Sequence, residues 1–152
     1  MNTGFFVEIG ETAQFSKTVT ETDVAMFCAI SGDFDPVHVD EEYARQTIFG
    51  RRIGHGILSM ALLSTVSAII SKRAVERGHR GVSVSMGYDH IRFLKPVFIG
   101  DTLTARYTIE SIDQVKRRTQ SKVAVENQRG EVVLIGEHLM KWLPPEPASQ
   151  TP

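Results

Sequence analysis

Residues 56–71 read GILSMALLSTVSAIIS, and the rest of the chain is best understood from this stretch outward. Its apolar residues fall on nearly every face of a helix, a pattern that a helix on the protein surface would not tolerate. The stretch is short for a membrane span of about 20 residues, and it also contains several serines and a threonine. It therefore predicts a central helix that the remainder of the chain wraps.

Alternating residues dominate the chain after this helix, which Gly78 and Gly81 are expected to end. Apolar side chains alternate with small or polar ones in residues 82–88, 103–109, 121–126 and 132–142, as in strands with one buried face. The alternation slips after residue 88, which predicts a bulge near Asp89. Residues 127–130 have the composition of a turn. We therefore expect an α+β fold, in which an antiparallel meander curls around the helix.

Shorter elements are predicted before the central helix. Residues 12–19 favour a strand, and Thr20 with Asp23 resembles a capping box for a helix that Ser31-Gly32 stops. Asp40 can cap a second short helix over residues 41–44. Residues 33–39 are expected to form an acidic loop between the two helices.

Length and composition indicate one domain, expected over residues 1–143, followed by a flexible proline-rich tail at 144–152. The formal net charge is -1, so no global field attracts nucleic acid or an anionic membrane, and neither is expected as a partner. The single cysteine, Cys28, has apolar neighbours and is expected to be buried. With no secretory pattern at the N-terminus, these features favour a reducing, cytoplasmic location.

Residues 31–40 read SGDFDPVHVD and hold the densest group of reactive side chains. Pro36 stiffens the segment between Asp33 and His38, and if that segment is extended the two side chains can point toward one cavity. An imidazole with a pKa of about 6.5 beside a carboxylate can position and activate one water. A purely structural interpretation stays open, in which Asp33 accepts bonds from loop amides and His38 is an ordinary surface or core histidine.

A metal interpretation of this loop is weaker. Asp33, Asp35, His38 and Asp40 resemble a hard-cation loop at first sight, but the EF-hand pattern needs glycine at its sixth position and glutamate at its twelfth. His38 and Ala44 stand there instead. We therefore expect no metal, and helix capping is a sufficient role for Asp40.

The sequence Gly54-His55-Gly56 leads into the central helix. The amides of a helix N-terminus lack intrahelical acceptors and can polarise a carbonyl oxygen, and Gly56 is the natural donor because it has no side chain. An equally good interpretation is that the glycines only ease a tight loop into the helix. Ser64 on the same helix can bond toward the acid/base pair or back to its own backbone.

Residues 31–38, continuing to Ala44, resemble the hydratase-2 motif of the MaoC-like, (R)-specific enoyl-CoA hydratases. The stretch HGIL that starts at His55 resembles the beginning of that family's central helix, and residues 93–101, FLKPVFIGD, resemble the strand and turn after it. The resemblance extends from about Gly10 to Leu143. It implies a hotdog fold, a long central helix wrapped by a curved antiparallel β-sheet, assembled as a homodimer or a dimer of dimers.

By matching position, the resemblance implies that Asp33 and His38 are the catalytic pair and that the Gly56 amide is the oxyanion donor. The supporting residues are Ser64, Asp35, Pro36 and His55. The implied reaction is hydration of a trans-2-enoyl thioester to the (R)-3-hydroxyacyl product, or the reverse dehydration. No metal or redox cofactor is implied, because coenzyme A or acyl carrier protein enters as part of the substrate.

Asp35 departs from the resemblance, because relatives usually carry asparagine at this position. If Asp35 points into the site, coupling between like charges can raise a pKa of the pair, whereas if it caps the turn little changes. Four basic residues are candidate contacts for the phosphates of the carrier, although each also fits a solvated surface position: Arg51, Arg52, Arg92 and Lys95.

Three alternative functions stay open from the sequence. They are a 3-hydroxyacyl-acyl carrier protein dehydratase, a hotdog acyl-CoA thioesterase and a noncatalytic acyl-CoA-binding hotdog protein. The Asp-Pro-x-His loop argues against the thioesterase, and the presence of both acid/base side chains argues against the noncatalytic protein.

Overall fold

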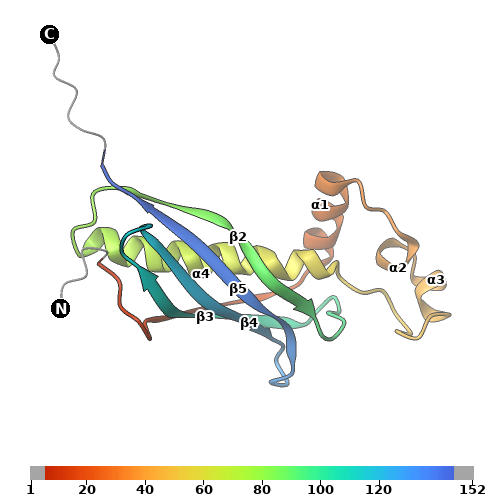
Figure 1. Cartoon of the computed structure of the whole chain (residues 1–152). Helices are drawn as coiled ribbons and strands as arrows, with labels where there is room; N and C mark the ends of the chain where they lie inside the picture. The colour runs from red at the N-terminus through yellow and green to blue at the C-terminus, as the bar shows by residue number, and fades with distance from the viewer. Residues whose placement is uncertain (1–5, 146–152) are drawn as a thin grey trace, which may run out of the picture.

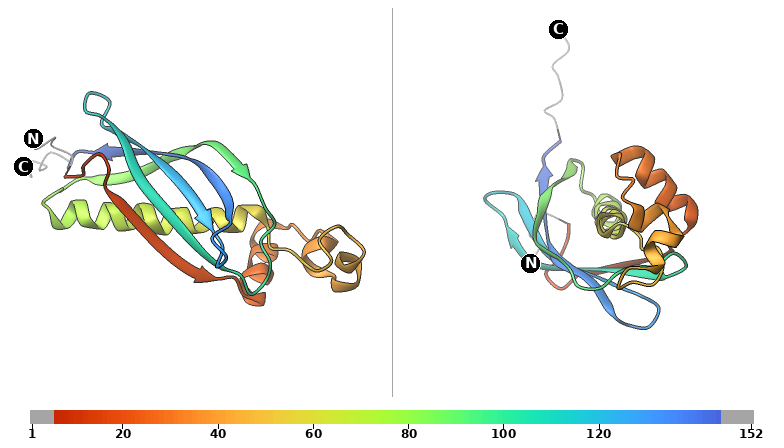
Figure 2. Two further views of the ribbon diagram at one scale, coloured as in Figure 1. Left: turned by 90° about the horizontal axis from the view of Figure 1, so that it is seen from below. Right: turned by 90° about the vertical axis from the view of Figure 1, so that its right-hand side faces the viewer.

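Helix α4 (Gly56–Glu76) forms the axis of the protein in the computed structural model, which describes residues 6–145 (Figure 1). A five-stranded antiparallel sheet curls around it in the order β1-β3-β4-β5-β2 (Figure 2). Its strands are β1 (Thr12–Thr18), β2 (Val82–Phe93), β3 (Thr102–Asp113), β4 (Arg118–Glu126) and β5 (Val132–Leu143). The predicted hotdog fold is therefore confirmed. The expected meander is wrong in one respect, because only β3, β4 and β5 follow one another in the sheet, and β2 pairs with β5 instead of β3.

The core lies between α4 and the concave face of the sheet. The α4 residues Leu63, Val66 and Ile70 are fully buried there, together with Tyr107 of β3 and Trp142 of β5. By length and composition alone α4 could also cross a membrane. In this fold its buried side chains belong to the same apolar core as those of the sheet.

Three short helices gather beyond the N-terminal end of α4 (Figure 1). They are α1 (Glu21–Ser31), α2 (Pro36–Val39) and α3 (Glu41–Arg45). The capping box of α1 is confirmed, because Thr20 and Asp23 exchange side chain-to-backbone bonds of 2.8 and 3.2 Å. Gly32 ends α1 with a φ of 78°, a left-handed conformation that glycine adopts without strain.

The expected loop over residues 33–39 is wrong in one respect, since α2 makes a helical turn within it. Pro36 occupies the first position of that turn, where its fixed φ suits a helix and its missing N–H is not needed. Asp35 caps the turn by accepting a 3.0 Å bond from the amide of Val37. Asp40 caps α3 as predicted, accepting a 3.0 Å bond from the amide of Tyr43.

Strand β2 lies at an edge of the sheet and breaks register twice. One break, between Asp89 and Arg92, is the predicted bulge, and the other, between Ser85 and Gly87, was not predicted. The alternating Val82 and Val84 were expected on a buried face but are exposed in the single chain. No residue of β2 is buried, because neither face of this edge strand is fully covered within the single chain. Most of the predicted tail, residues 146–152, lies outside the described residues.

Candidate active site

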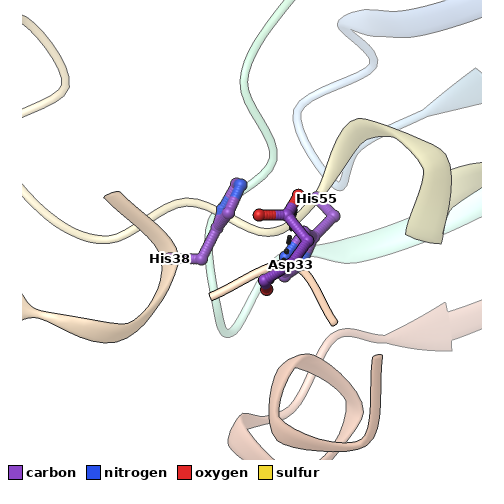
Figure 3. A group of neighbouring side chains, drawn as sticks. All are labelled: Asp33, His38 and His55. Atoms are coloured by element: carbon purple, nitrogen blue, oxygen red, sulfur yellow. Dashed lines mark hydrogen bonds and ion pairs between the residues drawn. The ribbon is translucent and has the colours of Figure 1, made fainter. Parts of the chain in front are cut away.

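Asp33, His38 and His55 meet at the N-terminal end of α4, although they come from three different segments (Figure 3). Asp33 follows the end of α1, His38 lies in α2, and His55 is the residue before α4. One polar atom from each side chain lies within 4.8 Å of the others. The structure therefore brings together the two side chains that the sequence selected, by a helical turn rather than an extended segment.

The orientation of His38 is set by the backbone oxygen of Ile53, which lies 2.8 Å from its Nδ1. A carbonyl oxygen can only accept a hydrogen bond, so Nδ1 carries the proton of the neutral ring. The other nitrogen, Nε2, then keeps a lone pair with which it can take a proton. His38 is thus held in the tautomer that suits a general base.

Asp33 is the exposed member of the group, with half of its side chain accessible. Its amide donates to Ser31 Oγ at 3.1 Å, and its Oδ1 accepts a 3.1 Å bond from the amide of Asp35. Its Oδ2 lies 3.7 Å from His55 Nε2. One carboxylate oxygen is therefore engaged in the local turn, as the structural interpretation anticipated, and the other faces the two histidines.

His55 is almost fully buried between the two candidate catalytic residues. Its ring stacks on that of His38, with 3.7 Å between centroids, and also contacts the Phe27 ring at 4.6 Å. Its Nε2 lies 3.2 Å from the backbone oxygen of Asp33 and 3.9 Å from Cys28 Sγ. Burial lowers the pKa of His55, which favours the neutral ring.

Gly56 begins α4, so its amide lies in the first turn, where amides have no intrahelical acceptor. A Cβ built on Gly56 would stand 3.0 Å from the Phe93 ring, which is too close for an ordinary contact. The glycine is therefore required for close packing against Phe93, which is more than easing a tight loop.

A cavity of about 430 Å³ opens beside the start of α4. Its lining is mostly apolar and comes from the segment before α4, the first turn of α4 and the end of β2 with the residues after it. The lining residues are Phe49, Ile53, Gly54, Gly56, Ile57, Ser59, Phe93, Leu94, Lys95, Pro96, Val97 and Val133. Such a cavity, with an amide donor at its wall, can take an apolar ligand that carries a carbonyl group.

In the part of the chain that the structure describes, the side chains of Asp35 and Ser64 make no hydrogen bond to Asp33, His38 or His55. Asp35 is exposed, and its Oδ1 caps α2, so the turn-cap alternative describes its hydrogen bonding. Ser64 is exposed on α4, about 12 Å along the helix axis from Gly56. Among the described residues no hydrogen bond joins its hydroxyl to Asp33 or His38.

The four basic candidates differ in what they contact. Arg52 forms ion pairs with Glu21 and Glu41, and its bond to Glu21 raises its pKa, so it braces the short helices. Arg92 donates to the backbone oxygen of the preceding residue. Lys95 lines the cavity but pairs with Glu131 at 2.7 Å. Arg51 is exposed and lies over the Phe98 ring at 4.0 Å.

Two imidazoles and a carboxylate within 4.8 Å are also a donor set that transition-metal ions accept. This set is not the predicted hard-cation loop, because Asp35 and Asp40 are both engaged as helix caps. The expectation that no metal takes part stays a prediction.

Sequence reasoning did not single out Phe27, Ile53 or Phe93 as parts of the site. Phe27 packs against His55, and Phe93 packs against Gly56. No local sequence motif predicts such contacts. Ile53 acts through its backbone oxygen, which every residue possesses, so its side chain gives no signal.

The sequence and the fold of this chain are similar to those of several known proteins. The family model described as "MaoC like domain" matches residues 5–132. The (R)-specific enoyl-CoA hydratase of Rhodospirillum rubrum is 36% identical over 135 residues, covering 86% of this chain and 85% of its own length. The enzyme of the same name from Aeromonas caviae is 32% identical, covering 89% and 95%. The solved structure of the unliganded (R)-hydratase PhaJ1 from Pseudomonas aeruginosa has a TM-score of 0.77 at 33% identity, covering 92% and 84%.

Proposed function

Because this chain belongs to the MaoC-like domain family, we propose that it is an (R)-specific enoyl-CoA hydratase. It adds water to a trans-2-enoyl thioester to give the (R)-3-hydroxyacyl thioester, or catalyses the reverse dehydration. The observation that carries the proposal is the orientation of His38, whose Nδ1 is held by Ile53 so that Nε2 is left for proton transfer, in a ring with a nitrogen within 4.8 Å of the Asp33 carboxylate. Both groups lie at the end of α4 that presents unpaired amides.

The two side chains divide the proton transfers between them. A water held by the Asp33 carboxylate and His38 Nε2 loses a proton to one of them as its oxygen attacks the β-carbon. The π electrons of the enoyl group move toward the thioester oxygen, and the α-carbon then takes a proton from the pair. Hydroxyl and proton arrive on the same face because the water and both side chains lie on one side of the substrate.

The Gly56 amide stabilises the charge that develops on the thioester oxygen. Its N–H donates where the oxygen becomes enolate-like, and the partial positive charge of the N-terminus of a 21-residue helix adds to this effect. Removing one such donor typically costs about 10²- to 10³-fold in rate.

The carrier approaches through the cavity beside Gly56. Of the four basic candidates, Arg51 is the best placed for carrier phosphates, because it is exposed, its guanidinium stacks on Phe98, and it forms no salt bridge within residues 6–145. Arg52 and Lys95 are already paired with carboxylates. Arg51→Ala is therefore expected to raise KM for the coenzyme A substrate more than Arg52→Lys does.

Hydration of crotonyl-CoA and longer enoyl-CoAs, followed by the loss of enoyl absorbance, tests the function. We expect turnover with an (R)-configured product, unchanged by a metal chelator. Release of free thiol without hydration would identify a thioesterase, and binding without turnover would identify a noncatalytic protein. Parallel assays with acyl carrier protein substrates distinguish the two carriers.

The functional unit is a homodimer joined along β2. Support comes from the free edge of this 12-residue strand, since a long exposed edge with apolar side chains is normally covered. Val82, Val84 and Met86 are all exposed along it in the single chain. Pairing of two β2 edges would continue the sheet from one protomer into its partner.

A further inference from the structure

One imidazole, that of His55, contacts both members of the candidate catalytic pair. Its face stacks on the His38 ring at 3.7 Å with 28° between the planes. Its Nε2 lies 3.2 Å from the backbone oxygen of Asp33. His55 also immediately precedes Gly56 in the chain. It therefore contacts, or is bonded to, each of the three residues that the proposed reaction uses, which are Asp33, His38 and Gly56.

The tautomer of His55 follows from these contacts. The backbone oxygen of Asp33 accepts but cannot donate, so Nε2 carries the proton. The other nitrogen, Nδ1, is buried without a hydrogen-bond partner in the described part of the chain. A proton on Nδ1 would have no acceptor, and a positive ring would face the His38 ring, so His55 stays neutral. A neutral ring so close to the site is suited to holding other groups in place.

The hydrogen bond from His55 also connects the turn formed by residues 33–35 to a distant segment of the chain. Within the described residues, the other hydrogen bonds of residues 33–35 are local and reach no farther than Ser31, Val37 and His38. Asp33 is half exposed, so packing does little to hold it. Without His55, the turn could move as a unit relative to His38.

We propose that His55 is a positioning residue, which fixes the separation of Asp33 and His38 by donating Nε2–H to the Asp33 backbone and stacking on the His38 ring. The proposal rests on the proposed function for its kinetic consequences. His55 takes no part in proton transfer. Its Nε2–H holds the Asp33 backbone, and the face of its ring holds His38.

Two substitutions separate these tasks. His55→Gln keeps an amide N–H near the position of Nε2 but loses the aromatic face, whereas His55→Phe keeps the face and loses the donor. The matched control is His79→Gln, because His79 is also buried and also has one unpartnered ring nitrogen. Its ring packs edge-on against Trp142 of the core, and it makes no contact with Asp33, His38 or Gly56.

With crotonyl-CoA, His55→Phe is expected to lower kcat by on the order of 10- to 100-fold with KM within about threefold, because misplacing a reacting group by about 1 Å has effects of this size. His55→Gln is expected to recover most of that loss. His79→Gln is expected to lower the thermal midpoint but to leave kcat unchanged. A wild-type kcat in His55→Phe, or an equal loss in His79→Gln, would overturn the proposal.

A measurement without substrate keeps this test independent of the proposed function. Amide hydrogen exchange of Asp35 and Val37 is expected to accelerate in His55→Phe and to stay near wild type in His55→Gln. If His55→Phe leaves this exchange unchanged, the positioning role is refuted even where activity is present. If exchange responds but the wild-type protein does not hydrate enoyl-CoAs, the positioning role stands and the hydratase proposal fails.

Discussion

Ile53 is joined to His38 through its backbone oxygen and to Val37, the residue before His38, through its backbone amide. The Nδ1 of His38 donates to the Ile53 backbone oxygen at 2.8 Å, and the Ile53 amide donates to the backbone oxygen of Val37 at 3.2 Å. Ile53 in turn bridges to Phe98, next to the sheet. The orientation of the proposed base is therefore set by backbone groups that are themselves tied to the body of the fold, which lowers the reorganisation needed for proton transfer.

The acid/base pair gives the first prediction. His38→Gln and Asp33→Asn should each lower kcat for crotonyl-CoA hydration by about 10²- to 10⁴-fold, the range of general acid–base catalysis. Asp40→Asn is the control, because asparagine also caps helices and, among the described residues, the Asp40 side chain bonds to the amide of Tyr43 and not to Asp33 or His38. Wild-type turnover in both Asp33→Asn and His38→Gln would refute the assignment.

Asp35 gives a second prediction, because its Oδ1 caps α2 while its side chain lies in solvent. Asparagine can accept the same bond, so Asp35→Asn should change the free energy of unfolding by less than about 0.5 kcal/mol and kcat by less than about threefold. Asp35→Ala removes the cap and should lower stability by about 1 kcal/mol. Urea unfolding and the pH profile of kcat/KM measure both effects, and a displaced acid limb in Asp35→Asn would show that the charge acts on the pair.

Gly54 and Gly56, which flank the N-cap of α4, provide a matched test of close packing. A Cβ on Gly56 would lie 3.0 to 3.2 Å from Phe93, whereas a Cβ on Gly54 would meet its neighbours at ordinary distances of 3.6 to 3.9 Å. Gly56→Ala should therefore displace Phe93 and the Gly56 amide and lower kcat at least about tenfold, and Gly54→Ala should be near neutral. Equal kinetics in the two variants would remove the basis for an oxyanion role at Gly56.

Much of this architecture could be predicted because it follows from local signals. The apolar run 56–71 predicted the central helix, the Thr20–Asp23 spacing predicted the capping box, and the alternation predicted the strands. The alternation did not predict that β2 leaves the meander and pairs with β5, because pairing between distant strands has no local signal. The loop over 33–39 was harder, because proline favours an extended residue before it and also favours the first turn of a helix. The cap from Asp35 to Val37 selects the helical turn.

Contacts between distant segments were beyond sequence reasoning. His138 of β5 was not singled out, yet it is fully buried, and its ring nitrogens contact the hydroxyls of Ser85 and Tyr107, which come from two other strands. The register breaks in β2 help to determine which residue of that strand faces His138, and a single sequence gives only an approximate position for such breaks. The Asp33–His55 contact could not be predicted for the same reason, because it joins the end of α1 to the start of α4, which are distant in the sequence.

The edge of β2 gives a prediction about assembly. Val84→Lys places a charge on the exposed edge strand and should convert the proposed dimer to a monomer in light scattering after gel filtration. Ser16→Lys is the control, because Ser16 is exposed on β1, the opposite edge strand. A wild-type protein that is monomeric, or a dimer lost only in Ser16→Lys, would contradict joining through β2.

The buried His138 makes the stability of the fold depend on pH. Its Nε2 lies 2.8 Å from Ser85 Oγ and its Nδ1 lies 2.9 Å from the Tyr107 hydroxyl, so the neutral ring has a partner at each nitrogen. Burial lowers the pKa of His138 from 6.5 to about 4. Between these two values the unfolded chain binds a proton that the native chain does not, so the free energy of unfolding falls as pH is lowered from 6.5 toward 4.

At about 1.4 kcal/mol for each pH unit, this single group should remove roughly 3 kcal/mol of stability by pH 4 and have no effect on the slope above pH 7. His138→Gln can keep hydrogen bonds to both hydroxyls without titrating, so urea unfolding of this variant should show a shallower loss over the same range. Carboxylates that titrate there affect wild type and variant alike, and the difference between the two curves isolates His138. Identical curves for His138→Gln and wild type would show that His138 is not the acid-sensitive group.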